Sequence, residues 1–165
     1  MKVGSPGPRA TETEASRWVA ATEAALRRAG GRSTAARRGI LRLLDAAASG
    51  MSAEELLLAL GAAGLPAARS TVYRTLDTLR EIGAVETVHP NPEHHRYLAR
   101  RSAHQHHLVC EVCGTVTTFD GCELEDEVIA AAVATGFRVR RHTLEILGSC
   151  AECGPPAIAT EPAAV

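Results

Sequence analysis

The sequence predicts an α+β fold in which an N-terminal winged helix-turn-helix domain precedes a small α/β domain that contains four paired cysteines. Three observations lead to this prediction. Four segments with helical spacing of apolar residues fill the first half and precede a strand–turn–strand pattern. Shorter segments of strand and helix type make up the second half. Two Cys-x-x-Cys pairs, Cys110 with Cys113 and Cys150 with Cys153, lie within that second half.

Composition limits both the core and the partners. Hydrophobic residues make up 45% of the chain and aromatic residues only 3%, so Ala, Leu, Val and Ile must build the core. Residues 1–90 hold 12 basic and 9 acidic side chains (+3), whereas residues 91–165 hold 6 and 10 (−4). The first half is therefore expected to face an anionic partner. No membrane span and no secretory segment is recognisable, which favours a cytoplasmic protein.

Apolar residues at helical spacing predict three helices in the first third of the chain. The first covers residues 13–29 and ends at a glycine pair. The second covers residues 34–48 and ends before a single glycine. Ser52 and Glu55 form a capping-box pattern, which opens the third helix over residues 53–63.

A fourth helix, over residues 70–82, buries a stripe formed by Val72, Leu76 and Leu79. In a helix-turn-helix, the N-terminal end of such a helix enters the major groove, where arginine reads guanine and hydroxyl groups bind phosphate. Arg37 on the second helix is a further expected DNA contact. The alternative is a solvated face in a plain helical domain. The expected contacts on this helix are Arg69, Ser70, Thr71, Tyr73 and Arg74.

Alternating residues predict a wing and then a second sheet. Strands over residues 84–88 and 96–98, with a Pro-Asn-Pro turn between them, would form the wing. Farther along the chain, strands are expected over residues 106–112, 115–119 and 137–147, with an amphipathic helix over residues 123–135.

Two Cys-x-x-Cys pairs separated by a connecting segment are typical of structural zinc, because each tight turn supplies two thiolates to a tetrahedron. The alternatives are two disulfides, which need an oxidising compartment, and redox-active dithiols. The sequence therefore predicts a structural Zn²⁺ that stabilises the C-terminal half.

The motifs, in this order and spacing, resemble the ferric uptake regulator family over roughly residues 15–153. The resemblance implies a homodimeric bacterial transcription factor, usually a repressor, whose metal-loaded dimer binds a palindromic double-stranded DNA operator. The motifs are Thr34-x-x-Arg37-x-x-Ile40-Leu41, Ser52-Ala-Glu-Glu-Leu56, Ser70-Thr-Val-Tyr-Arg-Thr-Leu76, His104-x-His-His-Leu-Val-Cys-x-x-Cys-Gly114 and the closing Cys-x-x-Cys.

Composition at the two ends and the resemblance between them divide the chain into four parts. Residues 1–12, with several Gly and Pro, would be a disordered N-terminus. The winged-helix DNA-binding domain would cover residues 13–99, and the metal-binding dimerisation domain residues 100–154. A flexible tail, rich in Pro and Ala, would follow over residues 155–165.

Family members typically have three metal positions, and two of them map fully onto this sequence. The structural zinc maps onto the four cysteines named above. A regulatory site for Zn²⁺ or Fe²⁺ maps onto His104, His106, Glu125 and His142. Histidines two apart on an extended segment share one face, which suits joint ligation.

The third, interdomain position departs from the family pattern. His107 and Glu86 match it, but Gln105 replaces a histidine and Gly50 replaces the histidine that iron and peroxide sensors use. Ala99 lies near the place where zinc sensors have a cysteine. Substitute ligands, or simply solvated turn residues, are found on the wing: His89, His94 and His95.

The expected function is a zinc-sensing repressor of metal-uptake genes, because His and Cys ligands suit zinc. The alternatives are an iron-sensing repressor or a peroxide- or thiol-based redox sensor of the same family. Cys122, ahead of the predicted helix, is either such a redox thiol or a small buried apolar residue. An enzyme is not expected, since the chain has neither His-Glu-x-x-His nor the deaminase spacing.

Overall fold

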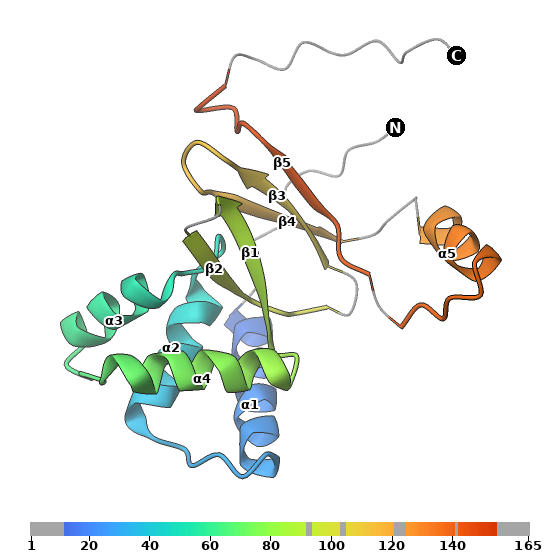
Figure 1. Cartoon of the computed structure of the whole chain (residues 1–165). Coiled ribbons are helices and arrows are strands. Elements are labelled where there is room, and N and C mark those ends of the chain that lie inside the picture. Colours follow the sequence, from blue (N-terminus) through green and yellow to red (C-terminus); the bar gives the residue numbers. More distant parts are fainter. Residues whose placement is uncertain (1–11, 92–93, 103–104, 121–124, 141, 155–165) are drawn as a thin grey trace.

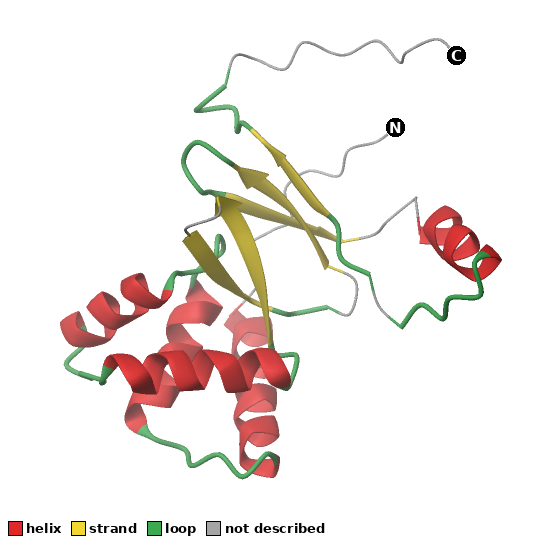
Figure 2. Cartoon of the chain, viewed as in Figure 1, coloured by secondary structure: helices red, strands yellow, loops and turns green. Residues whose placement is uncertain are grey.

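The computed structural model describes residues 12–91, 94–102, 105–120, 125–140 and 142–154. The fold is of the α+β class, with helices first and strands mainly after them (Figures 1 and 2). Predictions for the tail, for most of the N-terminus and for His104 and Cys122 lie outside the described residues. The helices are α1 (Glu12–Arg28), α2 (Ala35–Ala46), α3 (Ala53–Ala62), α4 (Arg69–Glu81) and α5 (Glu125–Ala134).

The four N-terminal helices begin and end close to the predicted positions, and two of them, α2 and α3, have side-chain caps. The Thr34 hydroxyl accepts a hydrogen bond from the Arg37 N–H and opens α2. Ser52 and Glu55 form both hydrogen bonds of a capping box at α3. The buried core between these helices is aliphatic apart from Trp18, as composition predicts: Ile40, Leu41, Leu44, Leu56, Leu60, Val72, Leu76 and Leu79 are the largest of its other members.

Strands β1 (Val85–Asn91) and β2 (His94–Ala99) form the predicted antiparallel hairpin and extend beyond the predicted bounds. Glu86 pairs with Leu98, and the register becomes irregular after Val88. Met51 bridges Tyr97, which ties the start of α3 to the hairpin.

Gly50 makes this connection possible. Its φ is +67°, and a Cβ would lie 2.6 Å from the Tyr97 carbonyl oxygen. We expect Gly50→Ala to lower the free energy of unfolding by about 2 kcal/mol or more, because left-handed backbone and a clash with backbone combine. Chemical denaturation measures this change. In Gly61→Ala, a matched control inside α3 with open space around it, stability should rise slightly. Equal effects of both substitutions would contradict this explanation.

A second sheet has the order β4-β3-β5, with β3 (Gln105–Cys110) between β4 (Val116–Asp120) and β5 (Glu145–Gly148). β4 is antiparallel to β3, and β5 is parallel to it. The predicted long strand over residues 137–147 is wrong, because, of the residues described in this segment, only those from Glu145 belong to a strand, Glu145–Gly148. β5 pairs with His107–Cys110 of β3, and the Leu144 carbonyl accepts one further hydrogen bond from the His107 N–H. β3 has only six residues, so it is too short to pair with the whole predicted segment.

The hairpin and the second sheet share a small apolar cluster of Val88, Leu98, Val109 and Val116. This cluster joins the helical part of the chain to the metal-rich part.

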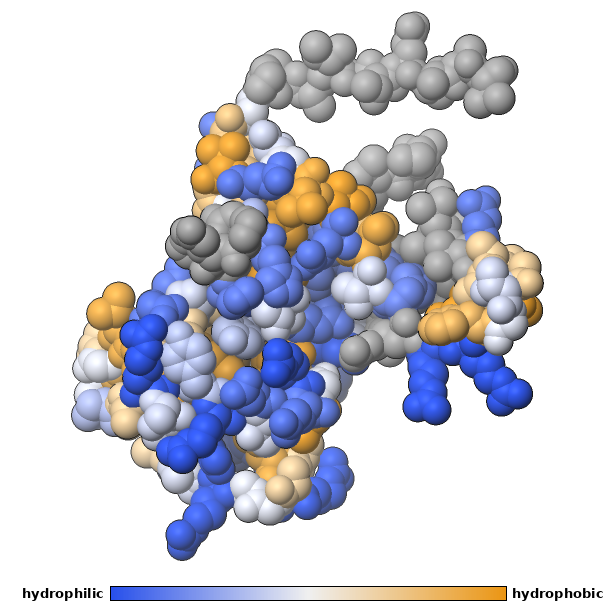
Figure 3. All heavy atoms as spheres, viewed as in Figure 1, coloured by the Kyte–Doolittle hydropathy of each residue, from blue (hydrophilic) through white to orange (hydrophobic). Residues whose placement is uncertain are grey.

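In contrast, α5 lies away from the sheet in Figure 1. Apolar side chains are exposed on both, as Figure 3 shows for the upper part of the molecule: Leu108, Val112, Ile146 and Leu147 on and near the sheet, and Val133 and Phe137 in and after α5. No helix in the described residues is long and apolar enough to cross a bilayer.

Candidate metal centres and nucleic-acid interface

The structure brings the four predicted cysteines together. Their sulfur atoms all lie within 4.8 Å of one another, and none forms a disulfide. Zn–S bonds of about 2.3 Å in a tetrahedron separate sulfurs by about 3.8 Å. The Cys113 and Cys150 sulfurs are 3.7 Å apart, close to that spacing. The donor set therefore fits a zinc site with four thiolate ligands.

Two similar turns position these sulfurs. The Cys110 carbonyl accepts a hydrogen bond from the Gly114 N–H, and the Cys150 carbonyl accepts one from the Gly154 N–H, both at 2.9 Å. One turn ends β3 and the other follows β5, so the parallel pairing of these strands brings the turns side by side. The Cys150 N–H also donates to the Cys110 sulfur at 3.3 Å.

Hydrogen bonding shifts the pKa values of three of these thiols in different directions. Backbone N–H groups, first that of Cys113 and then that of Cys150, lower the pKa of Cys110 to about 6. Hydrogen bonding with Thr115 lowers the pKa of Cys113. The neighbouring Cys113 sulfur is the main cause that raises the pKa of Cys153 to about 12. Four adjacent thiolates would repel one another. A bound dication offsets this repulsion and allows all four thiols to ionise.

Half of the predicted regulatory site is visible. The rings of His106 and His142 stack with their centroids 5.2 Å apart, and His106 is fully buried. The Leu144 N–H donates to Nδ1 of His106 at 3.1 Å. His104 and the side chain of Glu125 lie outside the described residues, so the completeness of this ligand set stays a prediction.

Among the described residues of the predicted interdomain set, the structure brings together only Glu86 and His107. Their Oε2 and Nε2 atoms are 2.9 Å apart. His89 and His95 instead stack edge to face on each other, 4.8 Å between centroids. The side chain of His94 lies outside the described residues.

Sequence reasoning missed Arg100, which completes this buried group. Its Nε lies 3.3 Å from Oε1 of Glu86. An arginine in the connection after β2 has no spacing signal, and only the fold reveals its partner.

The predicted DNA-contacting face of α4 is exposed and basic at its N-terminal end. Arg69, Ser70, Tyr73 and Arg74 are exposed, while Val72 and Leu76 are buried. The Arg74 Nε donates to the Ser70 carbonyl of its own helix at 3.2 Å. This leaves the end of α4 available to a ligand from solvent.

Glu54 on α3 is a second residue that sequence reasoning missed. Its Oε1 accepts hydrogen bonds from the Tyr73 hydroxyl, at 2.8 Å, and from the Arg69 guanidinium. The Arg69 guanidinium also donates to the Tyr73 hydroxyl at 3.2 Å. Glu54 thus fixes the relative position of the two side chains.

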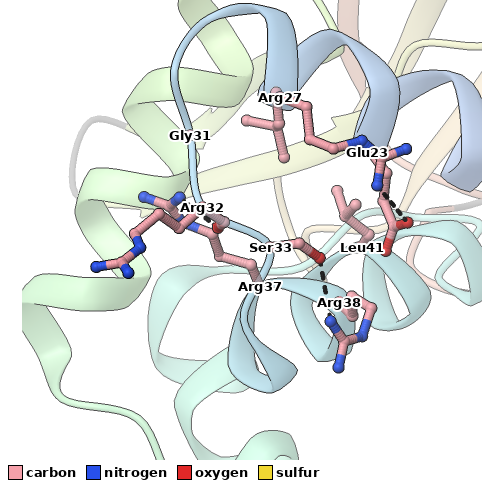
Figure 4. A pocket seen from close by; sticks show the side chains of 9 residues that line it. Glu23, Arg27, Gly31, Arg32, Ser33, Arg37, Arg38 and Leu41 are labelled. Atoms are coloured by element: carbon pink, nitrogen blue, oxygen red, sulfur yellow. Dashed lines mark hydrogen bonds and ion pairs between the residues drawn. The ribbon is translucent and has the colours of Figure 1, made fainter.

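A hollow between α1 and α2 adds positive charge to the helical half of the chain (Figure 4). Arg37 donates to the Arg32 carbonyl at 2.7 Å, and Arg38 donates to the Ser33 hydroxyl at 3.0 Å. One carboxylate, Glu23, lies among the lining residues, and its Oε2 is 3.8 Å from Nη1 of Arg27. Its charged lining residues are Glu23, Arg27, Arg32, Arg37 and Arg38.

Sequence comparisons identify relatives among regulators. The profile of the ferric uptake regulator family matches residues 28–147. A zinc uptake regulation protein of Mycobacterium tuberculosis is 40% identical over 127 residues, covering 76% of this chain and 96% of the relative. A peroxide-responsive repressor of Staphylococcus epidermidis is 32% identical over 130 residues, covering 79% and 86%.

Solved structures give the same assignment. The Vibrio cholerae ferric uptake regulator superimposes with a TM-score of 0.66 at 30% identity, covering 78% of this chain and 98% of that chain. A zinc uptake regulator complexed with zinc and DNA superimposes with a TM-score of 0.64 at 28% identity, covering 87% and 95%.

Proposed function

Because this chain belongs to the ferric uptake regulator family, we propose that residues 13–99 form its winged helix-turn-helix DNA-binding domain and residues 100–154 its metal-binding dimerisation domain. The protein is a metal-responsive transcriptional repressor and not an enzyme. Its metal-loaded homodimer binds a double-stranded DNA operator with palindromic symmetry. The 40% identity to a zinc uptake regulation protein supports zinc as the sensed metal and metal-uptake genes as the target. Operator DNA and free thiols support a cytoplasmic location.

The observation that carries this proposal is the exposed basic end of α4 in a chain that also holds a four-cysteine site. We assign base contacts to Tyr73 and Arg74 and phosphate contacts to Ser70 and Thr71. Arginine reads guanine edges with two parallel hydrogen bonds, and hydroxyl groups bind phosphate oxygens. Arg37, in the arginine-lined hollow, is suited to a backbone phosphate.

Arg69 has a different task in this interface. Glu54 holds its guanidinium against Tyr73, and the guanidinium lies 5.4 Å from the Tyr73 ring centroid. Arg69 therefore stabilises the orientation of Tyr73 and brings positive charge to the DNA. The carboxylate of Glu54 partly neutralises that charge. The main effect of the Glu54–Arg69 pair is therefore to position Tyr73 rather than to attract DNA without regard to sequence.

We expect Arg74→Ala to weaken operator binding by about 1 to 3 kcal/mol without changing dimerisation, because it removes a base contact at one end of α4. Fluorescence anisotropy with a duplex selected from a random library by the zinc-loaded protein measures the affinity. Arg80→Ala is the matched control, since Arg80 lies at the other end of α4 beside Asp77. Equal affinities of the Arg74 and Arg80 variants would remove this helix end from the interface.

The regulatory metal is assigned to His104, His106, Glu125 and His142. Nitrogen and oxygen donors in this set suit Zn²⁺ and also accept Fe²⁺. When bound, the ion would supply a cross-link between these ligands. No sulfur is needed in this set, which distinguishes it from the four-cysteine site.

His106 gives this site a means of responding to metal. A neutral imidazole that accepts the Leu144 N–H at Nδ1 carries its proton on Nε2. Ligation through Nδ1 would use the lone pair that accepts the Leu144 N–H. Ligation through Nε2 would move the ring proton to Nδ1, which could then no longer accept. In both cases this hydrogen bond is lost. Leu144 directly precedes β5, so metal loading would act on the segment that leads to Cys150. A metal ion that binds one arrangement of this segment more tightly than the other increases the population of that arrangement.

Peroxide or thiol sensing is the second candidate, and the 32% identity to a peroxide-responsive repressor favours it. In that mechanism, oxidation of thiolates of the four-cysteine site or of Cys122 would release DNA. Thiol titration before and after peroxide treatment, compared with retained zinc, distinguishes the two candidates. Loss of DNA binding with zinc retained and Cys122 oxidised would favour the redox mechanism.

A further inference from the structure

Three largely buried side chains meet between the hairpin and the second sheet. Glu86 on β1 uses one carboxylate oxygen for His107 on β3, at 2.9 Å, and the other for Arg100, at 3.3 Å. The side chains of Arg100, Glu86 and His107 are 18%, 12% and 0% exposed. We propose that the Arg100 guanidinium is a built-in cation at this junction and that the junction takes no metal ion.

Charge balance is the first argument. The guanidinium keeps its charge at all ordinary pH values. Its several N–H donors match the oxygens of a carboxylate. Both oxygens of Glu86 already have partners, so a metal ion would have to displace one of them. A dication placed beside the buried arginine would be repelled strongly in this poorly solvated position.

The shortage of ligands is the second argument. Gln105 stands near the junction, but its amide oxygen accepts from the Arg101 N–H at 3.2 Å and its amide nitrogen donates to the Ala99 carbonyl at 3.5 Å. Because its amide group already has these partners, Gln105 does not replace a histidine as a metal ligand. Zinc needs three or four protein ligands, and of the predicted set the described residues bring only Glu86 and His107 together here.

Gly50 cannot supply the ligand that the family pattern places on the helical side of the junction. It follows α2, and a Cβ there would lie 2.6 Å from the Tyr97 carbonyl oxygen and 2.8 Å from the Leu98 side chain. Any side chain at this position would meet backbone. His89 and His95 of the hairpin do not help, because they stack on each other.

The junction also bears on regulation, in a way that rests on the proposed function. The Glu86–His107 contact ties the hairpin of the DNA-binding half to β3, and under this inference no metal ion takes part in that contact. The response to metal would then come from the His106 site alone. This is a simpler arrangement than sensing through two coupled sites.

Zinc content per chain tests the inference. Wild type, Glu86→Gln and His106→Ala are equilibrated separately with zinc alone and with iron(II) alone, passed through a desalting column, and examined by elemental analysis. We expect Glu86→Gln to hold as much metal as wild type, and His106→Ala to hold about one ion fewer per chain. Loss of one ion from Glu86→Gln would overturn the inference. It would leave the proposed regulatory function intact, because no DNA is present in the experiment.

A double-mutant cycle tests the ion pair independently of metal content. Arg100→Met and Glu86→Gln should each lower the thermal midpoint by several degrees, because each leaves a buried polar partner unpaired. The double variant should lose clearly less than the sum of the two shifts. Additive shifts would show that Arg100 and Glu86 do not act together and would overturn the inference.

Discussion

Cys150→Ser is expected to abolish tight zinc binding at the four-cysteine site and to unfold the C-terminal half of the chain. Structural zinc in small domains contributes on the order of 10 kcal/mol of binding free energy, which is available only to the folded state. The apolar cluster of this half is small, and it depends on Val109 and Val116 beside two hairpin residues. Without the metal, β3 and β5 lose the link between the turns that follow them.

Zinc content and hydrogen exchange together measure this effect. In Cys150→Ser, amides of β3 and β5 should lose protection, while amides of α2 and α4 should keep it because their core is separate. Cys122→Ser is the matched control, since it makes the same chemical change at a cysteine outside the four-cysteine set. Retained protection of β3 in zinc-free Cys150→Ser would contradict a structural role for this metal.

His106→Ala is expected to remove the zinc dependence of operator binding. Coupling between two sites typically amounts to about 1 to 3 kcal/mol, or about 5- to 150-fold in affinity, and the whole of it should disappear. The physical reason is that His106 is a proposed ligand and also the acceptor of the Leu144 N–H. The variant should fold, because zinc remains at the four-cysteine site, although a buried imidazole is lost.

His89→Ala is the control for this experiment. His89 is exposed on the hairpin, so its replacement changes the histidine content of the chain without touching β3. Anisotropy titrations at low and high buffered free zinc should show the full zinc response in His89→Ala and none in His106→Ala. A normal zinc response in His106→Ala would move sensing to another site.

The sequence predicts the helices and the four-cysteine site well for a physical reason. Caps such as Thr34 and the Ser52–Glu55 box act within one turn, so local residues fix where helices begin. Cys-x-x-Cys turns likewise supply two ligands from four residues, and the fold has only to bring two such turns together.

Long-range features are less predictable. Residues 137–147 alternate like a strand, yet strand pairing also needs a neighbour, and β3 is too short to pair with the whole segment. The Arg100–Glu86 pair and the Glu54–Tyr73 contact depend on how separate elements pack, and no spacing in the sequence reveals them. The exposed apolar side chains of the sheet, such as Leu108 and Ile146, are suited to burial against a second copy of the chain in a homodimer, which no local pattern reveals.

Operator affinity of the wild-type protein as a function of free zinc tests the central claim most directly. The duplex is the one selected by the zinc-loaded protein, and salt is held constant because phosphate contacts make affinity salt-dependent. A metal-responsive repressor should bind about 5- to 150-fold more tightly at high than at low free zinc, with the zinc of the four-cysteine site retained throughout. Equal affinity at both zinc levels, while the second zinc ion binds and dissociates, would contradict zinc-responsive repression.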